Sequence, residues 1–215
     1  EPKEKPKPPQ AISFSRSVPL PKALQPEVLV AYRMNEQELS RDHGFPVRAI
    51  VPGHYGMASV KWLTRIEAVE TPFSGYWQTS EYAYWDDMNC NPVRRPLSEM
   101  MLKSAIARPS MYELVPQNQT YSIFGAAWCG SGNLKAVEVS TDSGETWSSA
   151  ELIDPVQPFA WRRWRHQWKT PSRPGRHILL SRAWDEKGNG QPLQHNPRHG
   201  SYLIHHAVPI HVFVE

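Results

Sequence analysis

The sequence predicts a mainly β protein, and two features support this. Short runs rich in β-branched and aromatic residues are bounded by Pro, Gly or Asn along the chain, as strands joined by tight loops are. The chain has 21 prolines among 215 residues, about twice the usual share, and proline interrupts helices. We expect the remainder of an α+β domain in residues 1–98 and an immunoglobulin-like β-sandwich in residues 99–215.

The charge balance and the cysteine count exclude several classes of protein. With 24 Lys and Arg against 21 Asp and Glu, the net charge is +3, too small to predict binding to nucleic acid. No apolar run approaches the roughly 20 residues that span a bilayer. The 2 cysteines provide neither a disulfide framework nor a Cys-rich zinc site.

In the first half, the strand-like runs are short and often alternate between apolar and polar residues. Such alternation in Val47–Val51 and Val60–Ile66 is typical of a half-buried strand. One short helix is expected around Lys22–Leu24, before Pro26. The runs themselves are AISFSRSV (11–18), EVLVAYRM (27–34), PVRAIVPG (46–53), SVKWLTRIEAV (59–69) and GYWQTSEYAYW (75–85).

The second half contains almost only strand patterns. Residues 97–107 (LSEMMLKSAIA) have helix formers without an apolar stripe, so we interpret them as a connector. About seven short strands separated by turn residues are typical of an immunoglobulin-like sandwich. We expect its core to draw on Trp128, Trp147, Trp161 and Trp164. The strands are expected at Tyr121–Ala127, Ala136–Ser140, Thr146–Ser149, Ala160–Trp168, His177–Ala183 and Val208–Val214.

The residues Asp142, Ser143 and Gly144 predict a tight hairpin turn. They follow the alternating strand AVEVS, and glycine adopts the left-handed backbone that such turns need.

The segment from Arg41 to Lys61 carries the chemistry most suited to an anion. His43 lies beside Gly44 on a loop, and Arg48 follows at the start of a strand. A histidine donor and the planar guanidinium fork suit a phosphate. A loop with two glycines then precedes Ser59 and Lys61, and such a loop can present N–H groups and an ammonium to a phosphate. The structural alternative is a turn with a surface lysine.

Taken together, these residues resemble a known family. Residues 34–68 (MNEQELSRDHGFPVRAIVPGHYGMASVKWLTRIEA) are similar to the second half of the molybdenum-cofactor domain of sulfite oxidases and plant-type nitrate reductases. The motifs that match are HGFPVR, VPG and VKWL. Glu36 replaces the family's glycine after Asn35. Residues 120–147 and 160–168 resemble the family's dimerisation domain, which is immunoglobulin-like.

The resemblance implies a molybdenum–molybdopterin cofactor and assigns roles to particular positions. His43 and Arg48 match residues that contact the pyranopterin and its phosphate. Ser59, Val60 and Lys61 match the segment that wraps the same cofactor. Tyr82 lies where the family has an active-site tyrosine near the molybdenum and the substrate, although aromatic neighbours also suit it to core packing.

A cation for an anionic substrate is also implied by the resemblance. Arg198, in the motif NPRHG, is the nearest match to a late arginine that reaches the substrate in the family. The cluster Arg162, Arg163 and Arg165 is a second candidate, which we interpret instead as a solvated strand face next to buried Trp161 and Trp164.

The resemblance implies that the family's molybdenum-ligating cysteine lies N-terminal of the matching block. Cys90 and Cys129 are not in that context, so we interpret both as structural or incidental and assign no metal ligand. The histidines near the end, such as His195 and His199, have a possible zinc spacing without a partnering cysteine or carboxylate cluster. We therefore expect the rest of the active site from the N-terminal half of the same enzyme.

The function implied by the resemblance is oxygen-atom transfer, sulfite to sulfate, by a molybdenum oxidoreductase. Its partners would be a small oxyanion substrate, a second copy of the chain and an external electron carrier such as a cytochrome. The family favours a periplasmic location. Two alternatives stay open: reduction of nitrate or another oxyanion by the same fold, and a non-catalytic dimerisation or binding module.

Overall fold

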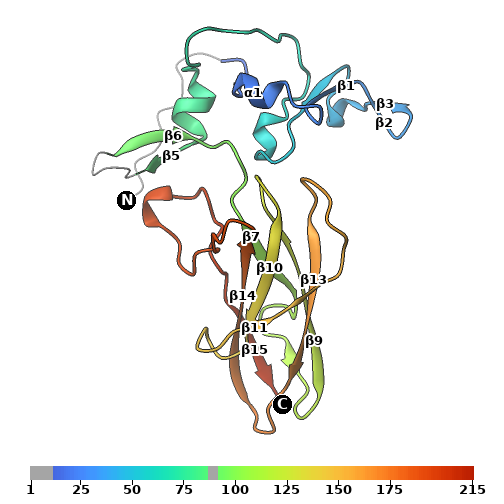
Figure 1. Cartoon of the computed structure of the whole chain (residues 1–215), viewed down its shortest axis with the longest axis vertical. Coiled ribbons are helices and arrows are strands. Elements are labelled where there is room, and N and C mark those ends of the chain that lie inside the picture. The colour runs from blue at the N-terminus through green and yellow to red at the C-terminus, as the bar shows by residue number, and fades with distance from the viewer. Residues whose placement is uncertain (1–11, 87–91) are drawn as a thin grey trace. The chain divides into compact units, whose positions relative to one another are not determined.

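The chain forms two compact units, shown in the computed structural model of Figure 1, which describes residues 12–86 and 92–215. The first unit comprises Glu1–Met100 and Pro197–Tyr202, and the second comprises Met101–Asn196 and Leu203–Glu215. The sequence analysis expected a single division between residues 98 and 99. The structure differs because the late segment Pro197–Tyr202 packs with the first unit.

The first unit consists of short elements joined by long loops. Its three small antiparallel pairs are β1 with β4, β2 with β3 and β5 with β6. The elements are α1 (Leu20–Ala23), β1 (Leu29–Ala31), β2 (Arg33–Met34), β3 (Gln37–Glu38), the 3₁₀ helix η1 (Arg41–His43), β4 (Arg48–Ile50), the 3₁₀ helix η2 (Gly56–Ala58), the π-helix η3 (Trp77–Glu81), β5 (Ala83–Asp86), β6 (Val93–Pro96) and the 3₁₀ helix η5 (Pro197–His199).

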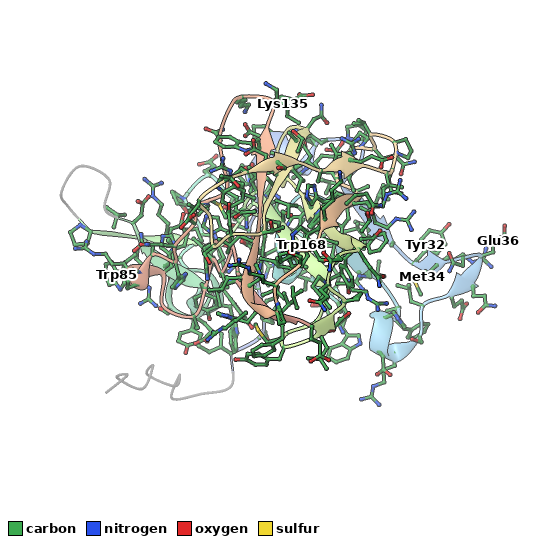
Figure 2. All side chains as sticks on the ribbon, turned by 90° about the horizontal axis from the view of Figure 1, so that it is seen from below. Tyr32, Met34, Glu36, Trp85, Lys135 and Trp168 are labelled. Atoms are coloured by element: carbon green, nitrogen blue, oxygen red, sulfur yellow. The ribbon has the colours of Figure 1, made fainter. Side chains whose placement is uncertain are left out.

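Glu36 lies in the turn of the β2–β3 hairpin and has a left-handed backbone conformation. Asn35 and Glu36 form its two-residue loop, with φ of 51° and 64°. Both angles are left-handed, as in the turns that fit twisted strands. The left-handed conformation costs a residue with a Cβ about 1–2 kcal/mol of free energy, whereas glycine adopts it without this cost. Figure 2 shows Glu36 at the outer end of this hairpin, with Tyr32 and Met34 nearer its base.

Two of the strands expected in the first half are absent, and a third is partly helical. Residues 12–18 and 59–69 form no strand, and residues 77–81 form η3. Residues 60–63 still bond to β4: Ala49 N–H donates to Val60 O and Leu63 N–H donates to Val47 O, each at 2.9 Å. Trp62 has a φ of 53°, and this left-handed residue interrupts the extended backbone that a ladder needs.

The second unit is the β-sandwich that the sequence predicts. Its five-stranded sheet has the order β11-β10-β14-β15-β8, and its four-stranded sheet has the order β12-β13-β9-β7. The sandwich has nine strands where about seven were expected, and β7, β8 and β12 lie outside the expected runs. The strands are β7 (Lys103–Arg108), β8 (Leu114–Val115), β9 (Thr120–Trp128), β10 (Leu134–Ser140), β11 (Ser148–Ser149), β12 (Glu151–Leu152), β13 (Arg162–Lys169), β14 (Gly175–Asp185) and β15 (Ile210–Val214).

The interpretation of residues 97–107 as a connector was wrong for their second part. Lys103–Arg108 form β7, which pairs antiparallel with β9. Ser104 is buried and its N–H donates to Gln191 Oε1 at 2.7 Å. The strand was missed because its inward face carries Ser104 and a single half-buried apolar residue, Ile106, rather than a row of large apolar residues.

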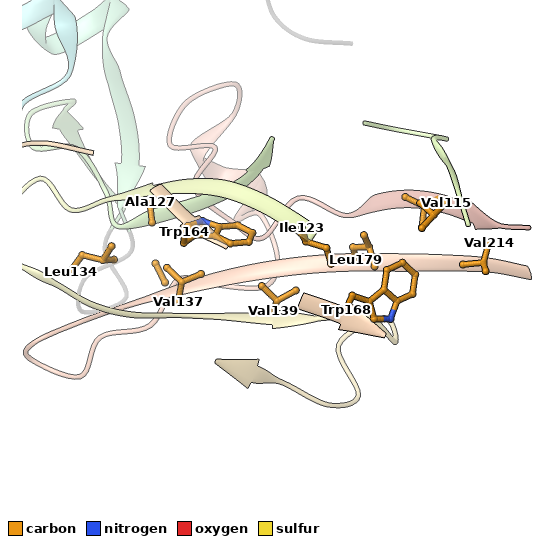
Figure 3. Close-up of a cluster of buried hydrophobic side chains, with 12 residues drawn as sticks. Val115, Ile123, Ala127, Leu134, Val137, Val139, Trp164, Trp168, Leu179 and Val214 are labelled. Atoms are coloured by element: carbon orange, nitrogen blue, oxygen red, sulfur yellow. The ribbon is translucent and has the colours of Figure 1, made fainter. Parts of the chain in front are cut away.

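The core of the sandwich lies between the two sheets (Figure 3). Trp164 is fully buried and Trp168 is 6% exposed, both on β13. The expected core tryptophan Trp161 is instead 64% exposed, since it precedes β13 and stacks on Trp128 with ring centroids 5.2 Å apart. The large apolar members of the cluster are Val115, Ile123, Leu134, Val137, Val139, Trp164, Trp168, Leu179, Val212 and Val214.

The predicted turn at Asp142–Gly144 is present. Ser143 and Gly144 have φ of 67° and 96°, and Ser140 Oγ donates to Asp142 Oδ1 at 2.7 Å. Hydrogen bonds from the Thr146 hydroxyl and backbone N–H lower the pKa of Asp142 to about 2, so its carboxylate stays charged and holds the turn.

Among the described residues, no helix is long and apolar enough to cross a membrane.

We predict that Gly125→Ala destabilises the sandwich. A Cβ on this glycine of β9 would overlap the Trp164 ring and the Ala105 carbonyl oxygen, and overpacking of this kind costs about 1–3 kcal/mol or more. Gly175→Ala on β14 is the matched control, because a Cβ there meets nothing within 4 Å. Urea unfolding should show a lower free energy of unfolding for the first variant only; equal stabilities would contradict this packing.

Candidate functional site

The loop after η1 gathers three side chains onto consecutive backbone carbonyls. Trp62 Nε1 donates to Arg41 O at 2.9 Å, Lys61 Nζ donates to Asp42 O at 2.9 Å and Arg48 Nη1 donates to His43 O at 3.1 Å. These carbonyls lie at the end of a helical turn, where carbonyl oxygens lack intrahelical partners and attract cations. The loop therefore brings Arg48 and Lys61 beside His43.

Gly44 makes this convergence sterically possible. It ends η1 with a φ of 110°, a backbone conformation that favours glycine. A Cβ at this position would lie 3.1 Å from the Cβ atoms of both Arg48 and Lys61. The two cationic side chains thus leave the backbone on either side of a buried glycine.

The other predicted cofactor residues lie in the same group of loop residues, which we call the loop cluster. His43 is exposed, and its Nδ1 lies 2.7 Å from Ser40 Oγ. Ser59 accepts from Val51 N–H through its hydroxyl at 3.0 Å and from Arg48 Nη2 through its carbonyl at 3.3 Å. Val60 pairs with Ala49. The structure thus brings together His43, Arg48, Ser59, Val60 and Lys61.

Tyr82 lies in a second cluster, immediately after η3 and before β5. It is half-buried, and its ring centroid is 6.2 Å from Phe14, 6.3 Å from Trp77 and 6.1 Å from Tyr202. The aromatic packing expected from the sequence is therefore real. No described residue makes a hydrogen bond to its hydroxyl, so the phenol remains available as a donor.

Arg16 also lies at Tyr82, and the sequence analysis missed it. Its Nη1 donates to Trp77 O at 2.6 Å, its Nη2 donates to Leu97 O at 2.5 Å, and its guanidinium carbon lies 6.0 Å from the Tyr82 ring centroid. The neighbouring Ser17 is held by Gln78 through a pair of hydrogen bonds of 2.8 and 2.7 Å. No sequence pattern pointed to Arg16, because its partners lie 61 and 81 positions away.

Arg198 lies on η5, exposed, in the segment that packs with the first unit. Two residues that follow it in the chain touch the Tyr82 region. The ring centroids of His199 and Tyr84 are 5.1 Å apart, and Tyr202 Oη is 3.4 Å from Glu81 Oε1. Arg198 and Tyr82 therefore belong to the same unit.

The alternative arginine cluster forms ion pairs within the sandwich. Arg163 forms a two-pronged pair with Asp154, with Nη2 2.7 Å from Oδ1, and Arg165 Nη2 is 2.8 Å from Glu151 Oε2. These bonds to Arg163 lower the pKa of Asp154 to about 2. Arg163 and Arg165 lie on the outer strand face, whereas half-buried Arg162 shares the face of buried Trp164, and Trp161 is exposed rather than buried.

The cysteines and late histidines supply no metal site in the part of the chain that the structure describes, where no group of three or more His, Cys, Asp or Glu could hold an ion. The Cys129 thiol donates to Ser131 O at 2.8 Å. Cys90 lies outside the described residues. His195 and His206 approach each other, with ring centroids 5.4 Å apart.

Comparison with known proteins decides the family. The family described as the Mo-co oxidoreductase dimerisation domain matches residues 94–211, and the one described as the oxidoreductase molybdopterin binding domain matches residues 3–77. The chain belongs to the sulfite oxidase-type molybdenum-cofactor oxidoreductases. The resemblance inferred from the sequence is thereby confirmed, as is molybdenum–molybdopterin as the cofactor of the family.

Individual relatives of this family are similar over most of the chain. Mouse mitochondrial sulfite oxidase is 36% identical over 197 residues, and barley NAD(P)H nitrate reductase is 32% identical over 207 residues. The sulfane dehydrogenase SoxCD of Paracoccus pantotrophus aligns with a TM-score of 0.78 and 29% identity, over 94% of this chain and 52% of that chain. The matches cover 86% of this chain with the mouse enzyme and 84% with the barley enzyme. The chain spans 36% and 22% of their respective lengths.

The loop cluster fits the phosphate-bearing cofactor of the family. Arg48 Nε is buried and has no hydrogen-bond partner among the described residues, and a buried unpaired donor is costly unless a ligand completes it. The donors are an imidazole, a guanidinium and an ammonium, which suit phosphate. The space beside them depends on Gly44, where a side chain would crowd Arg48 and Lys61.

Between β4 and η2 of this family member lies a buried histidine, His54, which is 8% exposed. Its Nδ1 is buried without a hydrogen-bond partner among the described residues. Burial lowers the pKa of His54 most; Glu99 opposes this shift, whereas Lys22 and Arg16 add to it. The folded chain therefore favours the neutral ring.

We predict that His54→Gln reduces the loss of stability on acidification. Because the folded pKa is lowered, the unfolded chain binds this proton first as the pH falls below about 6.5, and the free energy of unfolding decreases until the folded pKa is passed. Urea unfolding between about pH 8 and pH 5 should give a smaller decrease for the variant than for the wild type. Parallel curves would show that His54 is not held neutral.

Proposed function

We propose that this chain is part of a molybdenum oxidoreductase that catalyses oxygen-atom transfer, with sulfite as the substrate and sulfate as the product. The observation that carries the proposal is the gathering of His43, Arg48 and Lys61 around Gly44, within a unit whose family binds molybdopterin. Similarity to sulfite oxidases from mouse, rat and other animals favours sulfite.

In this proposal the loop cluster holds the phosphate end of the cofactor. The guanidinium of Arg48 donates through its unpaired Nε and through Nη protons left over from its two carbonyl contacts. Lys61 supplies a second positive charge and His43 an exposed ring donor. The bound cofactor supplies the two-electron redox chemistry, whereas the protein binds it, orients it and provides charge.

Tyr82 and Arg198 act on the substrate. The Tyr82 hydroxyl donates a hydrogen bond to an oxygen of the oxyanion, which is worth most where charge develops during the reaction. Arg198 provides a positive charge to the same substrate from η5. Support for this pairing comes from the contacts that its neighbours His199 and Tyr202 make with Tyr84, Tyr82 and Glu81.

The partners follow from the same proposal. A second copy would bind through the sandwich, as the description of the matching family implies for residues 94–211. The N-terminal half of the enzyme would complete the active site, and an external electron carrier such as a cytochrome would accept the electrons.

Nitrate reduction is the second candidate, since nitrate reductases of barley and Ulva prolifera are 32% identical over comparable lengths. The two reactions move electrons in opposite directions. Steady-state assays of the same preparation with sulfite plus an electron acceptor, and with nitrate plus a donor, separate them. Absence of molybdopterin would favour a non-catalytic module.

We predict that Arg48→Met and Lys61→Met each lower the molybdopterin content of the purified holoenzyme. Losing a charge-assisted phosphate contact costs about 1.5–3 kcal/mol, or roughly tenfold to a hundredfold in affinity. Pterin can be measured by fluorescence after oxidative release, and molybdenum by mass spectrometry. Arg65→Met is the control: this arginine is 76% exposed and pairs only with Glu67 in the structure described. Full pterin content in both test variants would refute the cofactor site.

A further inference from the structure

The most unusual charge in the first unit is that of Arg16. The side chain is half-buried, and its two terminal nitrogens are fixed on the neutral carbonyls of Trp77 and Leu97. Its Nε is buried and has no hydrogen-bond partner among the described residues. The guanidinium thus retains donor capacity and a full positive charge.

No carboxylate compensates this charge within the described residues. Burial lowers the pKa of Arg16, and the electrostatic influence opposing that shift comes from Tyr82. An arginine stays protonated in a protein, and a buried charge without a counter-ion is destabilising. The half-buried positive charge beside Tyr82 would therefore be stabilised by an anion.

The carboxylate nearest in sequence to Tyr82 is Glu81, which accepts hydrogen bonds from the Tyr76 and Tyr202 hydroxyls, each at 3.4 Å; burial and Tyr82, not Glu81, are the influences on the pKa of Arg16. The positive charges of Lys22 and Arg16 both disfavour protonation of buried His54, whereas Glu99 favours it. Lys22 already forms an ion pair with Glu27, 3.2 Å away. Arg16 is thus the cation that directly faces the Tyr82 ring, 6.0 Å from its centroid.

We propose that Arg16 is a specificity-determining residue, which selects small oxyanions for the site at Tyr82 by placing an uncompensated positive charge beside the phenol. The anion accepts a hydrogen bond from the Tyr82 hydroxyl and is attracted by the guanidinium. This inference rests on the proposed function only in taking Tyr82 as part of the substrate site.

The competing explanation is a purely structural role. Arg16 joins residue 77, at the start of η3, to residue 97, whose N–H bonds to Tyr82 O at 2.9 Å. A planar fork that bridges two carbonyls has no equivalent in lysine. A structural role therefore predicts equal losses for Arg16→Lys and Arg16→Gln, whereas selection by charge predicts that only Arg16→Gln loses oxyanion binding.

The test is a sulfate titration of the full chain labelled with 3-fluorotyrosine, in which the fluorine signal of Tyr82 is assigned from Tyr82→Phe. In the wild type this signal should shift saturably. The apparent affinity should fall about tenfold or more in Arg16→Gln and change by less than about threefold in Arg16→Lys, as expected for removal of a nearby charge. Arg65→Gln is the matched control and should bind as the wild type does.

Dimethyl sulfone, a neutral tetrahedral compound of similar size, provides a test without any variant. The Tyr82 signal should respond to sulfate and not to the sulfone at equal concentration. An equal response to both compounds, equal losses in the two Arg16 variants, or no sulfate response in the wild type would each overturn the proposal. Thermal melting of each variant checks that it is folded.

Failure here is distinguishable from failure of the proposed function. The sulfate response at Tyr82 requires no cofactor, whereas the cofactor test reports on Arg48 and Lys61. If the sulfate response depends on Arg16 while the holoenzyme binds no molybdopterin, the oxyanion site stands and the oxidoreductase assignment falls. If molybdopterin is bound normally while the sulfate affinity does not depend on Arg16, only the proposed role of Arg16 is refuted.

Discussion

The guanidinium of Arg16 connects the parts of the chain around Tyr82 and places a positive charge 6.0 Å from the centre of its ring. One side chain joins three parts of the chain: its own loop, the start of η3 at residue 77 and the end of β6 near residue 97. Tyr82 lies between the last two, so both ends of its segment are fixed by the same group. Buried carbonyls that lack a ladder partner need a donor, and here a cation supplies it. The result is a rigid segment with a positive charge next to a phenol.

In the loop cluster, side-chain donors also bind backbone carbonyls, here those at the end of η1. Three donors from residues 48, 61 and 62 satisfy the carbonyls that end η1, and Gly44 leaves space for two of these side chains to pass. The charges are therefore preorganised before any ligand binds, which reduces the ordering that binding must otherwise pay for. The residues of the loop cluster all belong to the first unit. The sandwich has a core of its own, in which Trp164 is fully buried.

Local patterns in the sequence predicted most strands of the sandwich, although not β7, and singled out the residues of the loop cluster. The turn at Asp142–Gly144 follows from residues next to each other, and His43, Arg48 and Lys61 are joined by motifs spanning fewer than about twenty positions, within reach of sequence-pattern arguments. The features that the sequence did not predict depend on contacts between residues far apart in the chain. The alternation in residues 60–66 did not give a strand because Trp62 adopts a left-handed φ of 53°. The return of Pro197–Tyr202 to the first unit and the contacts of Arg16 have no local pattern at all.

In the proposed active site, Tyr82 is a substrate contact and not only a member of an aromatic cluster. The most direct measurement is kcat/KM of the Tyr82→Phe holoenzyme, because this change keeps the ring and its packing and removes one donor. We expect kcat/KM to fall about 10²–10³-fold, as when a single donor to developing charge is removed, with an unchanged melting temperature. Tyr84→Phe, which removes the same group two residues later, should retain activity. An unchanged kcat/KM in Tyr82→Phe would contradict the account.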